Sequence, residues 1–191
     1  MLDRYECLRK LAARRGERDV VITTMSVAMP LAALSDGPLD FAHVDSAMGH
    51  AADFAYGLAL AQPERRVIVL NGDGSTLMSL GTLVTIAQRP APNYTLVIVE
   101  NGTYEVTGNQ PVPGAGRVDF ETIARGAGVQ RAYTLRDVAE FDARLEQHFT
   151  EEGPVVFVWK IGPGGEAVPR PALAIRERAR RLRRALVGDA D

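Results

Sequence analysis

Short aliphatic and β-branched runs alternate along the chain with segments whose apolar positions recur every three to four residues. The clearest runs are residues 67–70 and 95–99, which carry no charge on either face. Strands of this kind are buried on both faces in parallel sheets. Each is followed by a segment of helical periodicity, an order typical of parallel sheets covered by helices. The pattern predicts an α/β fold: a doubly wound, mostly parallel six-stranded sheet with helices on both faces.

The same pattern gives the bounds of the expected elements. We expect strands at residues 19–23, 41–44, 67–70, 95–99, 129–133 and 154–161, and helices at 2–15, 26–34, 49–62, 76–88, 120–126, 135–148 and 172–186. Residues 101–116 are rich in Gly, Asn and Pro and indicate a loop. We expect a single domain, with the binding unit over residues 1–165 and a linker and basic amphipathic helix over 166–191.

Composition narrows the class of protein. Of 191 residues, 46% are hydrophobic and 24% charged, the balance of a globular domain. The net charge of −2 does not favour binding to nucleic acid. No apolar run approaches the length needed to cross a membrane. The single cysteine, Cys7, excludes an internal disulfide, and without a visible secretory signal we expect a cytoplasmic protein. The basic last helix is interpreted as docking on its own domain or a subunit, with membrane or nucleic-acid binding as the alternative.

Two polar segments follow the two clearest strands. Asn71-Gly72-Asp73-Gly74-Ser75 follows residues 67–70, and Glu100-Asn101-Gly102-Thr103-Tyr104 follows residues 95–99. Ligands of open parallel sheets bind where such strand ends converge. Glycine beside a carboxylate lets a bulky anion approach the main chain, and the next helix offers free N–H groups. Carboxylate and amide oxygens suit a Mg²⁺ ion that also binds a diphosphate. A Gly-Asp-Gly alone is a common turn; its pairing with the second segment favours a cofactor site.

These segments carry a family resemblance. Gly72-Asp73-Gly74-Ser75, followed about 26 residues later by Asn101, resembles the signature of thiamine-diphosphate enzymes. Ser46-Ala47-Met48-Gly49-His50-Ala51 resembles the segment of these enzymes that contacts the pyrimidine ring of the cofactor. The chain is most similar to the β subunits of sulfopyruvate decarboxylases and the matching half of phosphonopyruvate decarboxylases. The resemblance covers nearly the whole chain, and its motifs are more specific for the cofactor than for the substrate.

The resemblance implies a role for each matching residue. Metal ligands would be Asp73, Asn101 and the main-chain carbonyl of Thr103; contacts to thiamine diphosphate would come from Ser46, Met48, Gly72, Gly74, Ser75 and Tyr104. Met48 would be the apolar wedge between the cofactor rings, and the Ser46 carbonyl would accept a bond from the pyrimidine amino group. His50 and Gln110 are further catalytic candidates. Two alternative interpretations remain open: His50 as a surface or core histidine, and Gln110 as a structural bridge within a turn.

The resemblance also implies a partner. The glutamate that this chemistry needs lies in a pyrimidine-binding domain, which we expect on a separate α subunit and hence in a hetero-oligomer; self-association without a partner is the alternative. The expected activity is decarboxylation of a small anionic 2-oxoacid such as sulfopyruvate or phosphonopyruvate. A carboligase of the acetolactate-synthase kind and a non-catalytic cofactor-binding module remain open. Two positions depart from the family pattern: Asp53 carries a charge in a helix where the relatives are uncharged, and Thr24-Met25-Ser26 stands where they tend to have a glycine turn near the cofactor.

Overall fold

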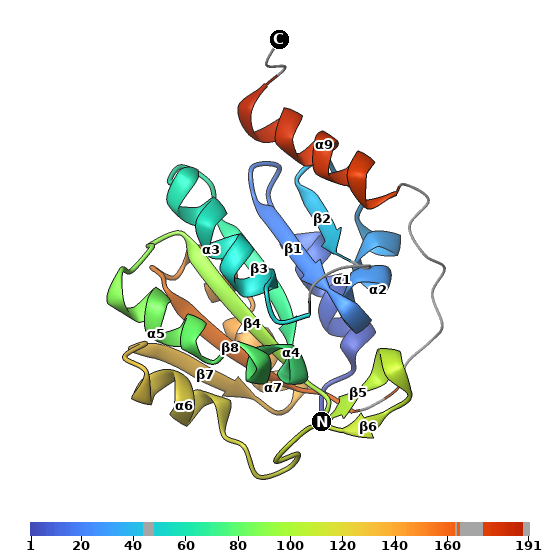
Figure 1. Ribbon diagram of the computed structural model, residues 1–191, viewed down its shortest axis with the longest axis vertical. Helices are drawn as coiled ribbons and strands as arrows, with labels where there is room; N and C mark the ends of the chain where they lie inside the picture. Colours follow the sequence, from blue (N-terminus) through green and yellow to red (C-terminus); the bar gives the residue numbers. More distant parts are fainter. Residues whose placement is uncertain (44–47, 163, 165–173, 189–191) are drawn as a thin grey trace.

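The fold is a single six-stranded parallel sheet covered by helices, as the sequence predicts (Figure 1). The computed structural model describes residues 1–43, 48–162, 164 and 174–188. The strands are β1 (Val20–Thr24), β2 (Asp40–His43), β3 (Val67–Gly72), β4 (Tyr94–Glu100), β7 (Arg131–Leu135) and β8 (Val155–Lys160). They lie in the order β2-β1-β3-β4-β8-β7, and every neighbouring pair is parallel.

Helices bury the sheet on both faces. One face packs against α3 (Ala51–Ala61), α5 (Gly81–Gln88), α6 (Phe120–Gly126) and α9 (Ile175–Val187). The other packs against α1 (Arg4–Arg14), α2 (Ala28–Leu34), α7 (Val138–Arg144) and α8 (Gln147–Thr150). Successive strand residues enter opposite clusters: Ile68 lies in the second and Val69 in the first, and both are fully buried. This double burial explains why the central strands read as continuous apolar runs.

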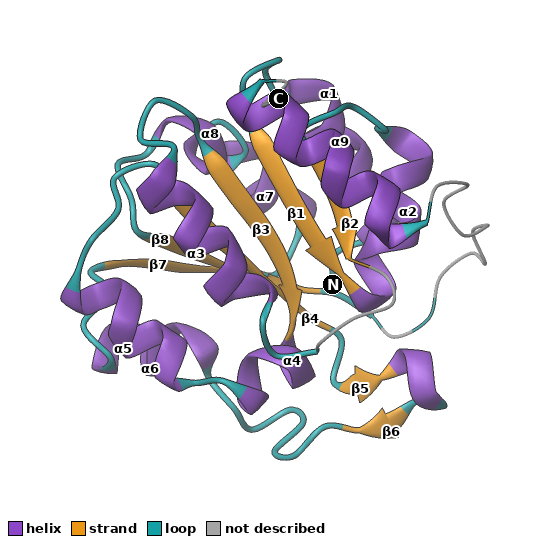
Figure 2. Ribbon diagram, turned by 45° about the horizontal axis from the view of Figure 1, so that its top comes forward, coloured by secondary structure: helices purple, strands orange, loops and turns teal. Residues whose placement is uncertain are grey.

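The order of the strands creates a switch point between β1 and β3. From β1 the chain moves outward to β2 and then returns to the other side of β1 to form β3. Three connections leave the carboxyl ends of the strands here (Figure 2): the 3-10 helix η1 (Met25–Val27) after β1, the helix α4 (Asp73–Met78) after β3, and the hairpin β5 (Thr103–Tyr104) and β6 (Gln110–Pro111) after β4. A second 3-10 helix, η2 (Glu105–Thr107), joins the two short strands. Ligands of doubly wound sheets bind at such a point.

The expected helix at residues 76–88 is wrong in extent. The structure has two helices there: α4 begins at Asp73, and α5 begins at Gly81. Ser79 leaves the helical conformation at φ −138° and ψ 49°, and its hydroxyl donates a hydrogen bond to the carbonyl of Gly49. This contact between distant segments ends α4, and helical periodicity alone does not reveal it.

Two further segments, residues 101–116 and 135–148, also differ from the prediction. Leu135 pairs with Trp159 in the sheet, so β7 begins and ends later than the predicted strand at 129–133. Asp137 then caps α7 by accepting the N–H of Glu140, and α8 follows as a separate turn. Residues 101–116, expected to be a loop, contain the hairpin and η2.

Helix α9 packs on the sheet beside β2 (Figure 1). Leu182 is 4% exposed within the first core cluster, and Arg181 pairs with Asp36 at 2.5 Å. The helix thus docks on the domain that carries the strands. Most of the residues between β8 and α9 lie outside the described residues, so the division at residue 165 stays a prediction. None of the described helices has the length and apolar character required to traverse a bilayer.

Candidate cofactor site

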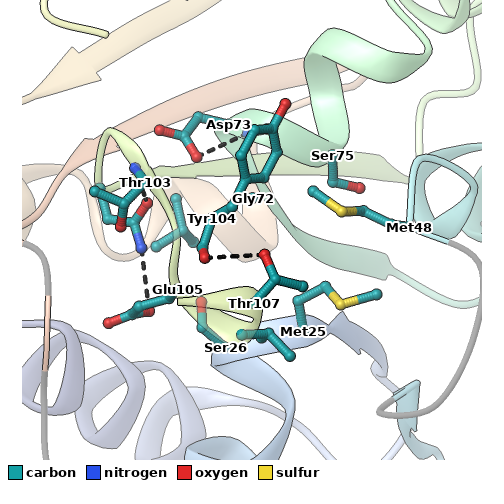
Figure 3. Close-up of a pocket in the computed structure, with 14 residues that line it drawn as sticks. Met25, Ser26, Met48, Gly72, Asp73, Ser75, Thr103, Tyr104, Glu105 and Thr107 are labelled. Carbon is teal, nitrogen blue, oxygen red and sulfur yellow. Dashed lines mark hydrogen bonds between the residues drawn. The ribbon is translucent and has the colours of Figure 1, made fainter. Parts of the chain in front are cut away.

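A cavity of about 430 Å³ opens at the switch point. Its walls come from the ends of β3 and β4, from the segments that follow β1, β3 and β4, and from Met48 before α3. Figure 3 shows Met25 and Met48 on one side and Thr103 and Glu105 on the other. The lining residues are Met25, Ser26, Met48, Gly72, Asp73, Gly74, Ser75, Val99, Asn101, Thr103, Tyr104, Glu105, Val106 and Thr107.

Asp73 joins the two polar segments. Its Oδ2 accepts the N–H of Gly102 at 2.7 Å, and its Oδ1 accepts the N–H of Gly74 at 2.8 Å. The first bond spans from the end of β3 to the end of β4, so the two segments are in direct contact. The Asp73 side chain therefore has its orientation set by the backbone.

The carboxyl group of Asp73 lies in an environment that disfavours its charge. The residue is 2% exposed, and none of the ion pairs in the described part of the chain involves it. Burial raises the pKa of Asp73 above its ordinary value, while the N–H groups of Gly102 and Gly74 oppose that rise. A buried carboxylate of this kind is stabilised when a cation binds beside it.

Asn101 lies beside Asp73 at the end of β4. Its Oδ1 accepts the N–H of Thr103 at 2.9 Å, and its Nδ2 donates to Oε2 of Glu105 at 3.1 Å. Glu105 forms an ion pair with Arg4 at 2.5 Å. Burial alone would raise the pKa of Glu105, but Arg4 and the hydrogen bonds from Gly164 and Ser26 together lower it below its ordinary value. Glu105 is thus a carboxylate at neutral pH.

The contact between Glu105 and Arg4 is not expected from the sequence. The two residues are 101 positions apart, and neither lies in a motif that singles it out. A glutamate in a Gly/Asn-rich loop is ordinarily a solvated residue. Only the fold brings α1 against the segment after β4, so sequence reasoning had no local signal for this pair.

Gly74 is required by the packing of Tyr104. A Cβ at this glycine would lie 2.4 Å from Cε1 of Tyr104 and 3.1 Å from Cγ1 of Val112. The tyrosine ring therefore lies directly against the main chain of α4. This close approach gives a steric reason for the glycine, and it ties the hairpin after β4 to the helix after β3.

Met48 and Ser75 form the wall between α3 and α4. The hydroxyl of Ser75 accepts the N–H of Gly49 at 2.8 Å, which holds the Met48 segment against α4. Gly49 has φ +94°, a conformation that L side chains rarely adopt. Met48 thereby presents its thioether to the cavity (Figure 3).

Met25 occupies an unusual backbone conformation. Its φ is +53°, in the left-handed region that costs a residue with a Cβ about 1 kcal/mol or more. It begins η1 directly after β1 and lines the cavity together with Ser26. Strained residues that persist in native structures often lie at functional sites. The departure noted at Thr24-Met25-Ser26 thus falls on the cavity wall itself.

The other candidate residues lie elsewhere. Ser46 lies outside the described residues. His50 is 68% exposed and bonds to Asp53 at 3.3 Å, while Gln110 is exposed and donates to the carbonyl of Thr107 at 2.9 Å. Neither lines the cavity. Asp53 also accepts a bond from the hydroxyl of Thr82. The catalytic roles of His50 and Gln110 stay predictions, and both have structural partners in the fold.

Fold and site together define a doubly wound α/β domain with a ligand cavity at the switch point of its parallel sheet. Residues 23–159 match the family described as thiamine pyrophosphate enzyme, C-terminal TPP binding domain. The match covers well over half of the chain and includes the end of β1, all of β3 and β4, and the residues that line the cavity. The chain belongs to this family and carries its thiamine-diphosphate-binding domain.

Relatives of known name share the same domain. The chain is 34% identical over 164 residues to the β subunit of sulfopyruvate decarboxylase from Methanocaldococcus jannaschii, covering 85% of this chain and 86% of that one. It is 34% identical to phosphonopyruvate decarboxylase from Streptomyces hygroscopicus over 86% of this chain, but it spans only 40% of that longer protein. A solved structure from Mycobacterium smegmatis, described as thiamin diphosphate-dependent, matches 84% of the chain and 32% of its own length with a TM-score of 0.70 at 22% identity, which establishes the shared fold.

Proposed function

We propose that this chain is the cofactor-binding, β-type subunit of a thiamine-diphosphate- and Mg²⁺-dependent 2-oxoacid decarboxylase. The observation that carries the proposal is the hydrogen bond from Gly102 to Asp73, which joins the ends of β3 and β4 around a buried carboxylate. The family match supplies the cofactor class. The remaining parts of the proposal concern the metal, the partner and the substrate.

The residues of the cavity suit a magnesium ion. Asp73 offers a buried carboxylate, and Asn101 offers an amide oxygen on the adjoining segment. Within the described residues, no three His, Cys, Asp or Glu side chains converge on one point. Such a site suits Mg²⁺, which takes few protein ligands and completes its octahedron with phosphate oxygens and water. The main-chain carbonyl of Thr103 would be the third protein ligand.

The remaining walls suit the two ends of the cofactor. Gly72, Gly74, Ser75 and Tyr104 surround the position proposed for the diphosphate. The Ser75 hydroxyl accepts the bond from Gly49, so its own proton is not used in that bond. Met48 places a polarizable, adaptable thioether where the rings would meet. When bound, thiamine diphosphate supplies an electron-accepting centre for the loss of CO₂ from a 2-oxoacid.

Exposed apolar side chains on the helices next to the cavity support a separate partner subunit. They are Phe54 and Leu60 on α3, Met78 on α4 and Val84 on α5, which are between 38% and 58% exposed. Met78 is continuous with the site, because it packs within 3.2 Å of the position of a Cβ on Gly49. Clusters of exposed apolar side chains mark interaction surfaces. We propose that a pyrimidine-binding α subunit covers this surface and brings the glutamate that the chemistry requires.

The substrate class follows from the relatives. The named relatives act on sulfopyruvate and phosphonopyruvate, which are small 2-oxoacids with a second anionic group. We propose a substrate of this kind for the complex of both subunits. A panel of 2-oxoacids, scored by CO₂ release in the presence of both subunits, would identify it.

Calorimetry with thiamine diphosphate and Mg²⁺ tests the cofactor site. We expect binding by the full chain, alone or with its co-expressed partner, that depends on Mg²⁺. Asp73→Ala should abolish the dependence on Mg²⁺, because it removes the buried carboxylate. Asp36→Ala is the control, since Asp36 pairs with Arg181 on the surface away from the cavity. If Asp73→Ala binds cofactor and metal as tightly as the wild type, the metal assignment fails. Binding without CO₂ release from any 2-oxoacid, with both subunits present, would favour a non-catalytic module.

A further inference from the structure

Glu105 is the meeting point of three distant segments at the cavity wall. Arg4, at the start of α1, donates from Nη1 to Oε2 at 2.5 Å and from Nη2 to Oε1 at 3.2 Å. The N–H of Gly164, beyond β8, donates to Oε1 at 2.8 Å, and the carbonyl of Gly164 accepts Nη2 of Arg4 at 2.6 Å. The side chains of Arg4 and Glu105 are only 10% and 12% exposed. A largely buried ion pair thus holds one carboxylate at this position.

A further bond to Glu105 comes from Asn101. Nδ2 of Asn101 donates to Oε2 of Glu105, and Oδ1 of Asn101 accepts the N–H of Thr103. Exchanging the amide oxygen and nitrogen would set a donor against the Thr103 N–H and an acceptor against the carboxylate. Both contacts would then be lost, so the orientation of the amide is fixed by chemistry. Glu105 is one of the two groups that determine where the Asn101 oxygen lies.

The carboxylate of Glu105 has no oxygen left for another role. An ionised carboxylate accepts about four hydrogen bonds. Glu105 accepts two from Arg4, one from Gly164 and one from Asn101, in addition to a bond from the Ser26 hydroxyl. A direct ligand to a metal ion would need a free oxygen. The geometry therefore separates Glu105 from Asp73, whose carboxyl accepts backbone N–H groups and has no ion-pair partner among the described residues.

We propose that Glu105, anchored by Arg4, is a positioning residue that holds the amide of Asn101 with its oxygen turned to the metal site. The inference rests on the proposed function, in which Asn101 is a ligand of Mg²⁺. Groups that orient a metal ligand from behind change metal affinity by about 10- to 100-fold when they are removed. Without Glu105 the amide can rotate, and the ligand oxygen is no longer presented in one orientation.

The test is the affinity for Mg²⁺ at a fixed, saturating concentration of thiamine diphosphate, measured by calorimetry on the same preparation that binds cofactor. Glu105→Ala should weaken Mg²⁺ binding about 10- to 100-fold. Glu105→Gln keeps an acceptor for Asn101 and should recover most of that loss. Arg4→Ala should give a smaller loss than Glu105→Ala, because the carboxylate stays but loses its anchor. Glu146→Ala is the matched control: it removes the ion pair between α1 and Glu146, far from the cavity, and should leave Mg²⁺ affinity unchanged.

A spectroscopic readout distinguishes positioning from mere support of the fold. With Mn²⁺ in place of Mg²⁺, the electron paramagnetic resonance spectrum should change in Glu105→Ala and return to the wild-type form in Glu105→Gln. Wild-type affinity in Glu105→Ala would overturn the inference, as would a Glu105→Gln variant that is as weak as Glu105→Ala. Wild-type Mg²⁺ affinity in Arg4→Ala would show that Arg4 does not anchor Glu105 in this role. Should Asp73→Ala leave Mg²⁺ binding intact, it is the proposed function that fails.

Discussion

His148 is the side chain whose titration the fold opposes most clearly. It is fully buried in α8, with Nδ1 bonded to the carbonyl of Arg144 at 2.9 Å. Nε2 lies 3.0 Å from the indole Nε1 of Trp159, which can only donate. The ring also stacks on Phe157 with 3.8 Å between centroids. These partners specify the neutral ring with its proton on Nδ1, so a second proton would break the bond to Trp159.

The magnitude follows from the pKa of His148. Burial lowers it from 6.5 to about 4. The unfolded chain therefore takes up a proton as the pH falls below 6.5, while the folded chain does so only near pH 4. Above pH 6.5 the residue has no effect on the pH dependence; between 6.5 and 4 it lowers the free energy of unfolding as the pH falls. At about 1.4 kcal/mol per pH unit, the full loss is about 3 kcal/mol.

Urea unfolding at a series of pH values between 7.5 and 4.5 measures this loss. The variant His148→Gln keeps one donor and one acceptor but cannot titrate. Glu105 and Glu146, whose pKa values are lowered, also reduce stability at low pH, and the comparison of wild type with variant cancels their contributions. We expect wild type to be more stable at pH 7.5 and its advantage to shrink by about 2.5 kcal/mol at pH 4.5.

Two results would refute this reasoning. Stability curves that run parallel for wild type and His148→Gln from pH 7.5 to 4.5 would mean that His148 titrates alike in the folded and unfolded chain. An NMR titration of the folded protein in which the His148 ring takes up its proton near pH 6.5 would lead to the same conclusion. Either result would place the ring in contact with water, contrary to its position between Phe157 and Trp159.

Two further predictions concern the cavity. Gly74→Ala should lower the free energy of unfolding by about 1–3 kcal/mol, because its Cβ would overlap the Tyr104 ring; in a double-mutant cycle, Tyr104→Ala should relieve part of that loss, and strict additivity would contradict it. At Met25, φ +53° should make Met25→Gly more stable than Met25→Ala by about 1 kcal/mol. Gly57, inside α3 with nothing within 4 Å of an added Cβ, should show the opposite sign, with Gly57→Ala gaining about 0.5–1 kcal/mol. The same sign at both positions in urea unfolding would contradict the strain at Met25.

The sheet is predictable from the sequence because each buried strand has its own run of apolar residues. Residues 67–70 and 95–99 are apolar at every position or nearly so, and the structure pairs them as neighbours within β3 and β4. The helix boundaries are less predictable because tertiary contacts set them. The Ser79 hydroxyl ends α4 by bonding to the carbonyl of Gly49, and no property of residues 76–88 alone reveals that partner.

The residues of the site also differ in how far the sequence predicts their positions. Asp73 and Asn101 could be placed together in advance, because the ends of successive parallel strands share one edge of the sheet. Gly74 could be expected to approach a neighbour closely, but the identity of that neighbour, Tyr104, depends on the hairpin. Arg4 could not be connected with the site at all, because α1 meets the segment after β4 only through the packing of the second core cluster. Local motifs predict which groups meet a ligand, and the fold alone determines which groups hold them in place.

The polar and apolar sides of the cavity are held in different ways, and this difference bears on what the site can distinguish. Asp73 and Asn101 accept backbone N–H groups, so their oxygens are oriented when the sheet folds and not when a ligand arrives. Groups that are already ordered lose little entropy on binding and recognise one geometry. Met25 and Met48 are long, flexible thioethers that adapt to the shape beside them. In the proposed function, a cation and a diphosphate would therefore meet groups that this chain has already oriented, whereas the ring and substrate end would take its final shape from the proposed partner subunit. That asymmetry is why the motifs of the chain specify a cofactor closely and a substrate only loosely.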